Sequence, residues 1–197
     1  FQADDGIRDS STSRGLGDVY KRQVYLETLG GGMGGRATKD GKDGVQVNIT
    51  NTSNLPVEAI EMEYPLRVED YALIEDSGGA GTHRGGMGIR RSIRPVGHMC
   101  EFNGVGERFR HQPWGIFGGT SGAQGAFHIE THDVEKVSLT SKASRVKLWP
   151  ENIVVISTPG AGGYGTPKNR TKDALRQDLA SGKFTEDFLN KHYKNNT

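Results

Sequence analysis

Carboxylates and an arginine gather in one stretch of the chain, which makes it the first candidate for chemistry. The stretch holds Glu58, Glu61 and Arg67, and it follows a loop that contains Thr50 and Asn51. Such charges could bind a polar substrate, because an arginine forms strong hydrogen bonds with carboxylates and oxyanions. The same pattern is also typical of the solvent-facing side of an amphipathic segment, or of a surface that pairs with a partner. The residues alone leave these interpretations open.

A second candidate is the glycine-rich run 76–88, DSGGAGTHRGGMG, in which six of thirteen residues are glycine. Glycine adopts positive φ without a steric cost, so such a run marks tight turns or a backbone pressed against another group. The run matches no Walker A phosphate loop, and a purely structural β-corner fits it equally well. Arg84 within the run, and the charged segment 107–110, are placed so that a charge could reach a cleft or form an ion pair at its rim.

Histidine and cysteine do not form a recognisable metal or nucleophile pattern. His128 and His132 are four residues apart, but on a strand that spacing separates them by about 13 Å, too far for one metal ion. We therefore predict no metal site within this chain. The single cysteine, Cys100, lies in an apolar run and is predicted to be a small buried hydrophobe without a catalytic role.

The composition argues against several classes of partner. The chain has 197 residues, with 25 lysines and arginines against 24 aspartates and glutamates, a net charge of +1. This balance gives no reason to expect binding to nucleic acid or to a membrane surface. No apolar run is long enough to cross a bilayer. One cysteine suits a reducing compartment, so a cytoplasmic location is predicted. The chain begins with Phe1, and we expect it to be a fragment.

The chain divides into three predicted parts, namely residues 1–23, 24–167 and 168–197. In the first part, the run SSTSRGLGDVYKRQ resembles translated adapter sequence, so residues 1–23 are predicted to be non-native; a disordered native tail is the alternative. The second part shows short strands with glycine-rich turns between them, typical of a β-sandwich or barrel. The third part is predicted to be a helical tail. The fold class is therefore mainly β with a C-terminal helical tail, α+β overall.

The expected elements follow from apolar periodicity and turn signals. Strands are predicted at residues 24–29, 45–50, 71–74, 89–96, 98–103, 126–130, 136–139, 146–148 and 153–157. A short helix over 56–63 would direct Ile60 and Met62 inward and end at Pro65. Three large aromatic residues are expected to pack the core or to cap its ends: Trp114, Phe117 and Trp149.

The helical tail is predicted over residues 171–193. Apolar residues recur there at helical spacing, and Gly182 divides the region into two helices. Thr185 is the expected N-cap of the second helix, because its hydroxyl can accept a hydrogen bond from a free backbone N–H of the first turn.

Five motifs in a fixed order resemble the C-terminal part of the hydantoinase B/5-oxoprolinase family. They are GGGMGGR (30–36), DGVQVNITNTSNLPVEAIEMEYPLRVEDY (43–71), DSGGAGTHRGGMGI (76–89), RFRHQPWGIFGG (108–119) and TPGAGGYGTP (158–167). The resemblance covers about residues 24–197. The loop NLPVE (54–58) is more similar to the stand-alone version of the family, of the N-methylhydantoinase B type, than to other versions.

The resemblance implies a piece of an ATP-dependent hydrolase of cyclic amides such as hydantoin, N-methylhydantoin or 5-oxoproline. In such systems a hydantoinase A-like partner binds ATP and phosphorylates the amide oxygen, and the B-type subunit supplies the hydrolytic site. A hetero-oligomer is therefore expected, with a divalent metal held by residues upstream of this chain. The fragment alone is expected to be inactive. Two alternatives are a subunit of an ATP-dependent ketone carboxylase (acetone- or acetophenone-type) and a non-catalytic β-rich docking module.

The resemblance also places candidate substrate-binding residues, although it assigns no catalytic residue. Glu58 or Glu61 would orient the substrate nitrogen, and Arg67 or Arg84 would hold a carboxylate or oxyanion. The full set of candidates is Thr50, Asn51, Glu58, Glu61, Arg67 and Arg84. The chain departs from many relatives at Asn48, where a histidine is expected, so its specificity or chemistry would differ if that histidine binds substrate or metal.

Overall fold

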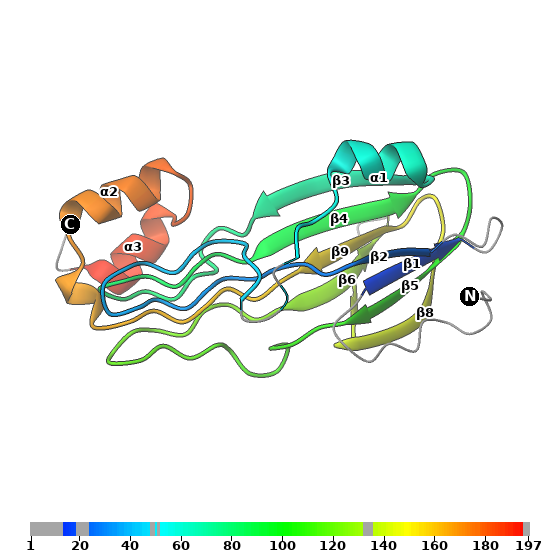
Figure 1. The fold of residues 1–197 in the computed structure, drawn as a ribbon. Coiled ribbons are helices and arrows are strands. Elements are labelled where there is room, and N and C mark those ends of the chain that lie inside the picture. The colour runs from blue at the N-terminus through cyan, green and yellow to red at the C-terminus, as the bar shows by residue number, and fades with distance from the viewer. Residues whose placement is uncertain (1–13, 19–23, 48–49, 51, 132–135, 195–197) are drawn as a thin grey trace.

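The computed structural model describes residues 14–18, 24–47, 50, 52–131 and 136–194. The molecule is elongated (Figure 1). The strands lie at one end, the two C-terminal helices lie at the other, and long glycine-rich loops run between them. The mainly β fold with a helical tail is confirmed.

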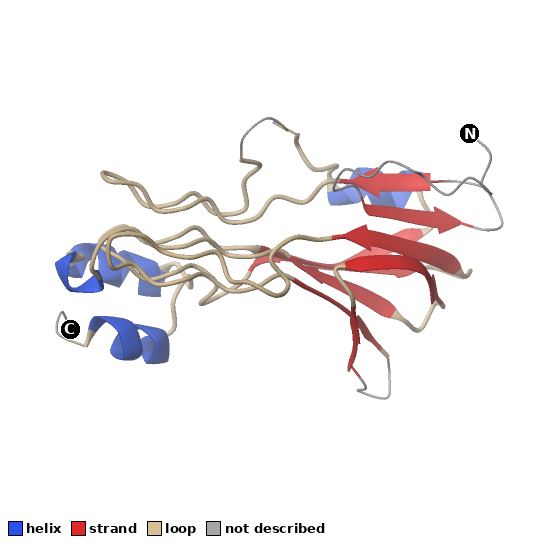
Figure 2. Cartoon of the chain, turned by 90° about the horizontal axis from the view of Figure 1, so that it is seen from below, coloured by secondary structure: helices blue, strands red, loops and turns tan. Residues whose placement is uncertain are grey.

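The strands form two antiparallel sheets that remain open (Figure 2). The first has the order β3-β4-β9-β6-β7 and the second the order β2-β1-β5-β8. The bounds are β1 Arg14–Asp18, β2 Val24–Glu27, β3 Leu66–Leu73, β4 Ile89–Pro95, β5 Cys100–Val105, β6 Ala126–Glu130, β7 Lys136–Leu139, β8 Lys142–Leu148 and β9 Ile153–Ser157. Because the sheets do not close, the sandwich-like form of the prediction fits and the barrel-like form does not.

The main core contains residues from both sheets. Its centre includes Phe102 of β5 and Phe127 of β6. Their rings pack edge to face, with 5.6 Å between the ring centroids. Strand β5 alternates buried and half-buried residues, the period that lets one face of a strand enter the core. Cys100 begins this strand and is buried, as predicted.

The short helix α1, Val57–Glu63, packs on this core with one face only. Ile60 is fully buried, as expected, but Met62 is 86 % exposed. The expectation for Met62 was wrong because residues two positions apart in an α-helix are turned by about 200° around its axis. The last helical hydrogen bond runs from the Tyr64 N–H to the Ile60 carbonyl at 2.9 Å, and the helix ends there.

The predicted tail is confirmed as helices α2, Lys172–Ala180, and α3, Glu186–Tyr193, preceded by the 3-10 turn η1, Pro167–Asn169. The hydroxyl of Thr185 accepts the Phe188 N–H at 3.1 Å, so the predicted N-cap is present. Gly182, between the two helices, has a φ of 64°, a conformation that favours glycine.

Two segments differ from the expectations. Residues Arg14–Asp18, within the part expected to be non-native or disordered, form β1 because they pair with both β2 and β5 and complete that sheet; the non-native origin of residues 1–23 stays a prediction. Residues 45–47 form no strand, since Val45 makes only an isolated bridge to Gly31 and the Gln46 side chain binds the Thr28 carbonyl instead. Residues 48 and 49 lie outside the described residues.

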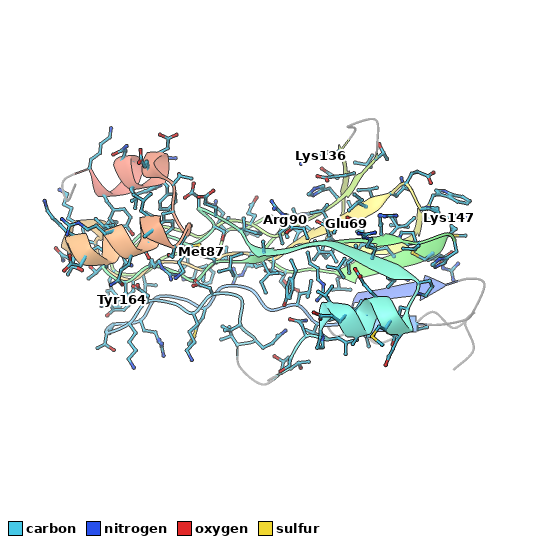
Figure 3. The ribbon with its side chains drawn as sticks, turned by 90° about the horizontal axis from the view of Figure 1, so that it is seen from above. Glu69, Met87, Arg90, Lys136, Lys147 and Tyr164 are labelled. Atoms are coloured by element: carbon cyan, nitrogen blue, oxygen red, sulfur yellow. The ribbon has the colours of Figure 1, made fainter. Side chains whose placement is uncertain are left out.

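Four extended segments without regular secondary structure make up the middle of the molecule, and we call them the glycine bundle: residues 30–36, 77–88, 113–125 and 158–165. The last segment bonds to all three others, through Gly35 N–H to Gly162 O at 2.9 Å, Gly79 N–H to Ala161 O at 2.8 Å and Gly163 N–H to Thr120 O at 3.0 Å. Figure 3 shows Met87 and Tyr164 in this part of the molecule, beside the C-terminal helices.

Glycine is required where these segments touch. A Cβ atom on Gly85 would lie 1.9 Å from the Ala161 carbonyl oxygen, and one on Gly160 would lie 1.8 Å from that of Ser77. No side chain fits at such distances, so the glycine-rich runs let backbones approach each other. Backbone hydrogen bonds therefore hold these segments together, while Ala80 and Met87 pack in a second apolar cluster with the C-terminal helices. No helix in the described part of the chain is long and apolar enough to cross a membrane.

Candidate functional site

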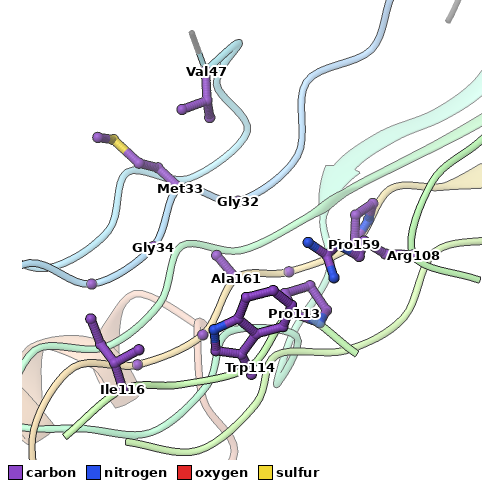
Figure 4. A pocket seen from close by; sticks show the side chains of 14 residues that line it. Gly32, Met33, Gly34, Val47, Arg108, Pro113, Trp114, Ile116, Pro159 and Ala161 are labelled. Atoms are coloured by element: carbon purple, nitrogen blue, oxygen red, sulfur yellow. The ribbon is translucent and has the colours of Figure 1, made fainter. Parts of the chain in front are cut away.

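An open groove lies on the glycine bundle. Its volume is about 340 Å³ (Figure 4), within the range of small-molecule sites. Its lining residues are Gly32, Met33, Gly34, Gly35, Val47, Arg108, Pro113, Trp114, Ile116, Pro159, Gly160, Ala161, Gly162 and Gly163. Most of this lining is glycine backbone or apolar side chain, so the groove suits a small apolar ring.

The groove forms because one bundle segment is bare of side chains on this face. Gly162 lies under Trp114, and a Cβ atom there would lie 2.0 Å from the Trp114 carbonyl oxygen. The backbone of Trp114 can therefore lie directly against that of Gly162. Gly34 is different, because its nearest neighbour to an added Cβ would be 3.9 Å away. Gly34 thus marks a place where the groove is open to added atoms.

The three aromatic residues that were expected to pack the core or to cap its ends lie on the surface. Trp114 is 65 % exposed and Phe117 is 75 % exposed, and Trp149 is also exposed. Phe117 packs against the ring of Tyr164, at 5.1 Å between centroids. The expectation of core packing was wrong for Trp114 and Phe117 because their segment belongs to the bundle, where closely approaching backbones leave no room for these rings.

The guanidinium of Arg108 lies at one end of the groove. Its Cζ atom is 4.8 Å from the centroid of the Trp114 ring, a cation–π contact. Arg108 has a φ of 60°, which is uncommon for a residue with a Cβ atom. Figure 4 shows its guanidinium near Pro159, at the opposite end from Ile116. The sequence indicated an unusual charge in segment 107–110 but gave no sign of this geometry.

The helical tail is fastened to the bundle by a cluster of charges, which we call the charge clamp: Asp40, Asp43, Arg84, Arg170 and Asp178. Arg84 donates to Asp178 at 3.0 Å and to Asp43 at 2.7 Å. Arg170 donates to Asp40 at 2.8 Å and to Asp178 at 2.6 Å. The two guanidinium groups are almost fully buried. Their hydrogen bonds are therefore electrostatically stronger than they would be in water.

The clamp changes the acidity of its members. Burial by itself would raise the pKa of Asp40, but the hydrogen bond and charge of Arg170, with Arg84, outweigh it and lower that pKa. Burial likewise opposes the shift at Asp43, where hydrogen bonds from Arg84 and from the Met87 N–H lower the pKa. Both carboxylates are therefore held in their charged form.

A second buried charge pair lies between the sheets and the loop that precedes α1. Arg91 Nη1 lies 2.7 Å from Glu27 Oε2, as an ion pair without hydrogen-bond alignment. Glu27 also accepts the Tyr25 hydroxyl and the Leu55 N–H, the latter at 3.1 Å. Burial, followed by the hydrogen bond to Glu27, raises the pKa of Tyr25. This network fixes the end of the loop that follows Thr50.

The candidates from the sequence fall in several places. Glu58 and Arg67 are exposed, and Arg67 lies 3.8 Å from Glu69. Glu61 accepts the Val68 N–H at 3.0 Å, which joins α1 to the irregular part of β3. Thr50 is exposed and donates to the Gln46 side chain at 3.1 Å.

The remaining two candidates lie elsewhere. Arg84 is buried in the charge clamp, and Asn51 lies outside the described residues. None of the five described candidates lines the groove. The structure therefore places Glu58 and Glu61 on α1 and Arg67 on the adjoining strand β3, apart from Arg84. It adds a second place, around Arg108 and Trp114, that the candidates from the sequence do not include.

A metal ion does not fit the described residues. No group of three or more histidine, cysteine, aspartate or glutamate side chains in them is close enough to hold one. His128 lies 3.2 Å from Glu130, while residue 132 lies outside the described part. We therefore derive no step through a metal in this chain.

Comparison with known proteins assigns the chain to a family. A family model described as hydantoinase B/oxoprolinase matches residues 6–167. The chain belongs to the hydantoinase B/oxoprolinase family. An uncharacterised protein of Methanocaldococcus jannaschii is 44 % identical over 171 residues, which are 87 % of this chain and 30 % of that protein. A protein of a Pseudomonas species, named as the B-type subunit of a D-/L-hydantoinase, is 34 % identical over 167 residues, 83 % of this chain and 28 % of its own.

A solved structure supports the fold of this family member. The crystal structure of an ATP-dependent caprolactamase from Pseudomonas jessenii superposes with a TM-score of 0.79 over 95 % of this chain, at 22 % identity. At that identity the likeness shows the fold alone. The chain spans 34 % of the caprolactamase chain, and so about a third or less of the length of each of these three proteins.

Proposed function

We propose that this chain forms the C-terminal part of the B-type subunit of an ATP-dependent hydrolase of small cyclic amides. Membership of the hydantoinase B/oxoprolinase family supports the proposal, as does 34 % identity to a protein named as a B-type hydantoinase subunit. The fold shared with an ATP-dependent caprolactamase agrees with it.

The single observation that carries the proposal is the groove on the glycine bundle. Its walls are apolar and its volume of about 340 Å³ is ample for a five- to seven-membered lactam or hydantoin ring, whose faces and edges are largely apolar. The exposed indole of Trp114 offers a flat apolar surface on which a ring can stack, and the side chain of Ile116 offers a second apolar contact. The groove therefore holds and orients the ring while polar chemistry takes place at its amide edge.

The proposed reaction couples two hydrolyses. A hydantoinase A-like partner binds ATP and transfers its γ-phosphoryl group to the amide oxygen, which activates the carbonyl carbon towards water. Water attacks this carbon and the C–N bond breaks, which opens the ring and leaves an amine that carries an acyl phosphate. A second water hydrolyses the acyl phosphate and releases phosphate and the free carboxylate. A divalent metal that lowers the pKa of bound water would be held by residues outside this chain. The ATP requirement and the single cysteine favour the cytoplasm.

Polar groups near α1 remain proposed substrate residues in this scheme. Glu58, Glu61 and Arg67 do not line the groove, so in this scheme their exposed charges would bind a polar part of the substrate beyond the ring or pair with the partner subunit. Thr50 and Asn51 stay proposed substrate residues from the sequence. Arg84 is different, because its hydrogen bonds are used within the charge clamp. We propose that Arg84 supports the bundle that carries the groove.

The test is turnover by the complete B-type subunit that contains this chain, combined with its A-type partner. The substrates are 5-oxoproline, hydantoin, N-methylhydantoin and caprolactam, each with ATP, and acetone with ATP and bicarbonate. We expect ADP release together with a ring-opened product from at least one cyclic amide. Turnover that occurs only with ketone and bicarbonate would overturn the hydrolase proposal in favour of a carboxylase. A stable complex without turnover on any substrate would favour a docking module.

A further inference from the structure

The groove carries one ionisable side chain among the described residues that line it, and this is Arg108. All other lining residues are glycine, alanine, proline, valine, isoleucine, methionine or tryptophan. A lone cation at the end of an apolar groove makes the site asymmetric. One end suits an apolar ring, and the other suits a negative charge.

The donors of Arg108 are not used by a carboxylate. No acidic side chain in the described part of the chain lies within ion-pair distance of Arg108, whereas arginines such as Arg90 and Arg94 pair with Asp70 and Glu69 across β3 and β4. The contact of Arg108 with the face of the Trp114 ring uses the charge of the guanidinium but none of its N–H groups. The planar fork therefore stays available to bind an anion through two parallel hydrogen bonds.

The backbone of Arg108 is also held in an unfavourable conformation. Its φ of 60° brings the Cβ atom close to the backbone, and such a conformation persists only where the surroundings impose it. Here the Arg108 carbonyl accepts the Gly125 N–H at 3.2 Å, which ties the residue to the far end of the same loop. The backbone of Arg108 is thus held in place, and its guanidinium lies over the ring of Trp114.

We propose that Arg108, supported on Trp114, is the anion-binding subsite of the groove and receives the negatively charged group of a small cyclic amide. This inference rests on the proposed function for the class of ring, and it adds the residue that binds the charge. The charge is either a carboxylate on the ring, as in 5-oxoproline, or the phosphoryl group placed on the amide oxygen. The ring lies along the apolar wall towards Ile116.

Direct binding tests this inference independently of turnover. The chain has two tryptophans, Trp114 and Trp149, so the Trp149→Phe variant of the full chain reports on Trp114 alone. The probes are 5-oxoproline, 2-pyrrolidinone, which has the same ring without a carboxylate, and inorganic phosphate. We expect a saturable change in Trp114 fluorescence with 5-oxoproline at least tenfold tighter than with 2-pyrrolidinone. Phosphate binding at the same site would identify the phosphoryl group as a second source of the charge.

A matched pair of variants isolates the guanidinium. Arg108→Gly suits the positive φ and removes the charge, while Arg145→Gly makes the same change at a φ of 52° on β8, away from the groove. We expect Arg108→Gly to raise the dissociation constant for 5-oxoproline at least tenfold and Arg145→Gly to leave it unchanged. Arg108→Lys keeps the charge but loses the fork, so it should fall between the two.

Three results would overturn the inference. They are no saturable response to either anion up to tens of millimolar, equal affinity for 5-oxoproline and 2-pyrrolidinone, and an unchanged dissociation constant in Arg108→Gly. Each can occur in a protein whose complete enzyme opens cyclic amides, so the inference would fail while the proposed function stands. Conversely, anion binding at Arg108 in an enzyme without cyclic-amide turnover would retain the subsite and remove the proposed reaction.

Discussion

Arg84 and Asp178 form a buried ion pair that joins the glycine bundle to helix α2, with Arg84 Nε donating to Asp178 Oδ1 at 3.0 Å. The pair links two parts of the chain that are 94 residues apart. Both side chains are almost completely buried, at 6 % and 5 % exposed. The glycine-rich run that contains Arg84 therefore has a structural role, which is to receive the helical tail.

Arg84→Ala should destabilise the protein strongly. The substitution removes the arginine that binds Asp43 and one of the two arginines that bind Asp178, which keeps its bond to Arg170. Breaking a buried pair costs roughly 3–5 kcal/mol, and we expect a loss approaching that size. The free energy of unfolding, from a urea titration followed by circular dichroism, measures the loss. Arg176→Ala is the control, because the Arg176–Asp173 pair on α2 is exposed and should change stability by less than about 0.5 kcal/mol. Equal midpoints for the two variants would show that the clamp is not needed.

Acid should weaken the clamp. The folded pKa values of Asp40 and Asp43 lie below the ordinary value of 3.8, so these groups stabilise the fold fully above that pH. Their contribution is lost as the pH falls through the folded pKa values, because protonation breaks the bonds to Arg170 and Arg84. Urea midpoints measured from pH 7 downward should fall below about pH 4, and an Asp40→Asn, Asp43→Asn variant should lose part of this fall. Asp173→Asn should keep the whole of it.

Closely packed glycines should not tolerate a methyl group. Gly160→Ala would place Cβ 1.8 Å from the Ser77 carbonyl oxygen, and the backbone would have to move, at a cost of about 1–3 kcal/mol or more. Gly34→Ala is the matched change within the same bundle, since its nearest neighbour would be 3.9 Å away. We expect the first to lower the melting temperature by several degrees and the second to leave it unchanged or slightly raised. A tolerated Gly160→Ala would contradict the backbone packing described here.

Large aromatic residues should differ sharply in their contribution to stability. Phe102 is fully buried, and Phe102→Ala should cost about 3–5 kcal/mol. Trp114 is 65 % exposed, so Trp114→Ala should cost little in the free energy of unfolding while it removes the apolar wall of the groove. Thermal and urea unfolding of both variants would settle this. An equally large loss in the free energy of unfolding for Trp114→Ala and Phe102→Ala would contradict the surface position of Trp114.

The sequence predicted elements whose pattern is local. The apolar pattern and turn signals predicted a strand at 98–103, which overlaps β5, and the break at Gly182 predicted the two helices of the tail, because both depend on neighbours along the chain. The glycine bundle depends on hydrogen bonds between segments far apart, such as Thr120 N–H to Ala80 O at 2.8 Å. No local pattern encodes which glycine approaches which carbonyl.

The same reason explains the candidate site. The polar candidates around Glu58 stand out because a dense group of charges is visible in the sequence. Arg108 and Trp114 also stand in a motif of the sequence, RFRHQPWGIFGG. A single arginine and a single tryptophan indicate a binding site only once the structure places both in the lining of one groove. A signal that could have found them is the large aromatic residue next to glycine in a loop, where no core is available to bury it.

Placement of the substrate in the groove is tested by cyclic-amide turnover of the complete enzyme in which Gly34 is replaced by leucine. Gly34 lines the groove, and a Cβ atom there would meet no atom closer than 3.9 Å, so we expect Gly34→Leu to occupy the groove while the backbone contacts of the bundle stay in place. Gln177→Leu, on the exposed face of α2, is the control. We predict that Gly34→Leu lowers kcat/KM at least tenfold with an unchanged unfolding midpoint, while Gln177→Leu changes neither. Full activity in Gly34→Leu would contradict the placement of the substrate in the groove.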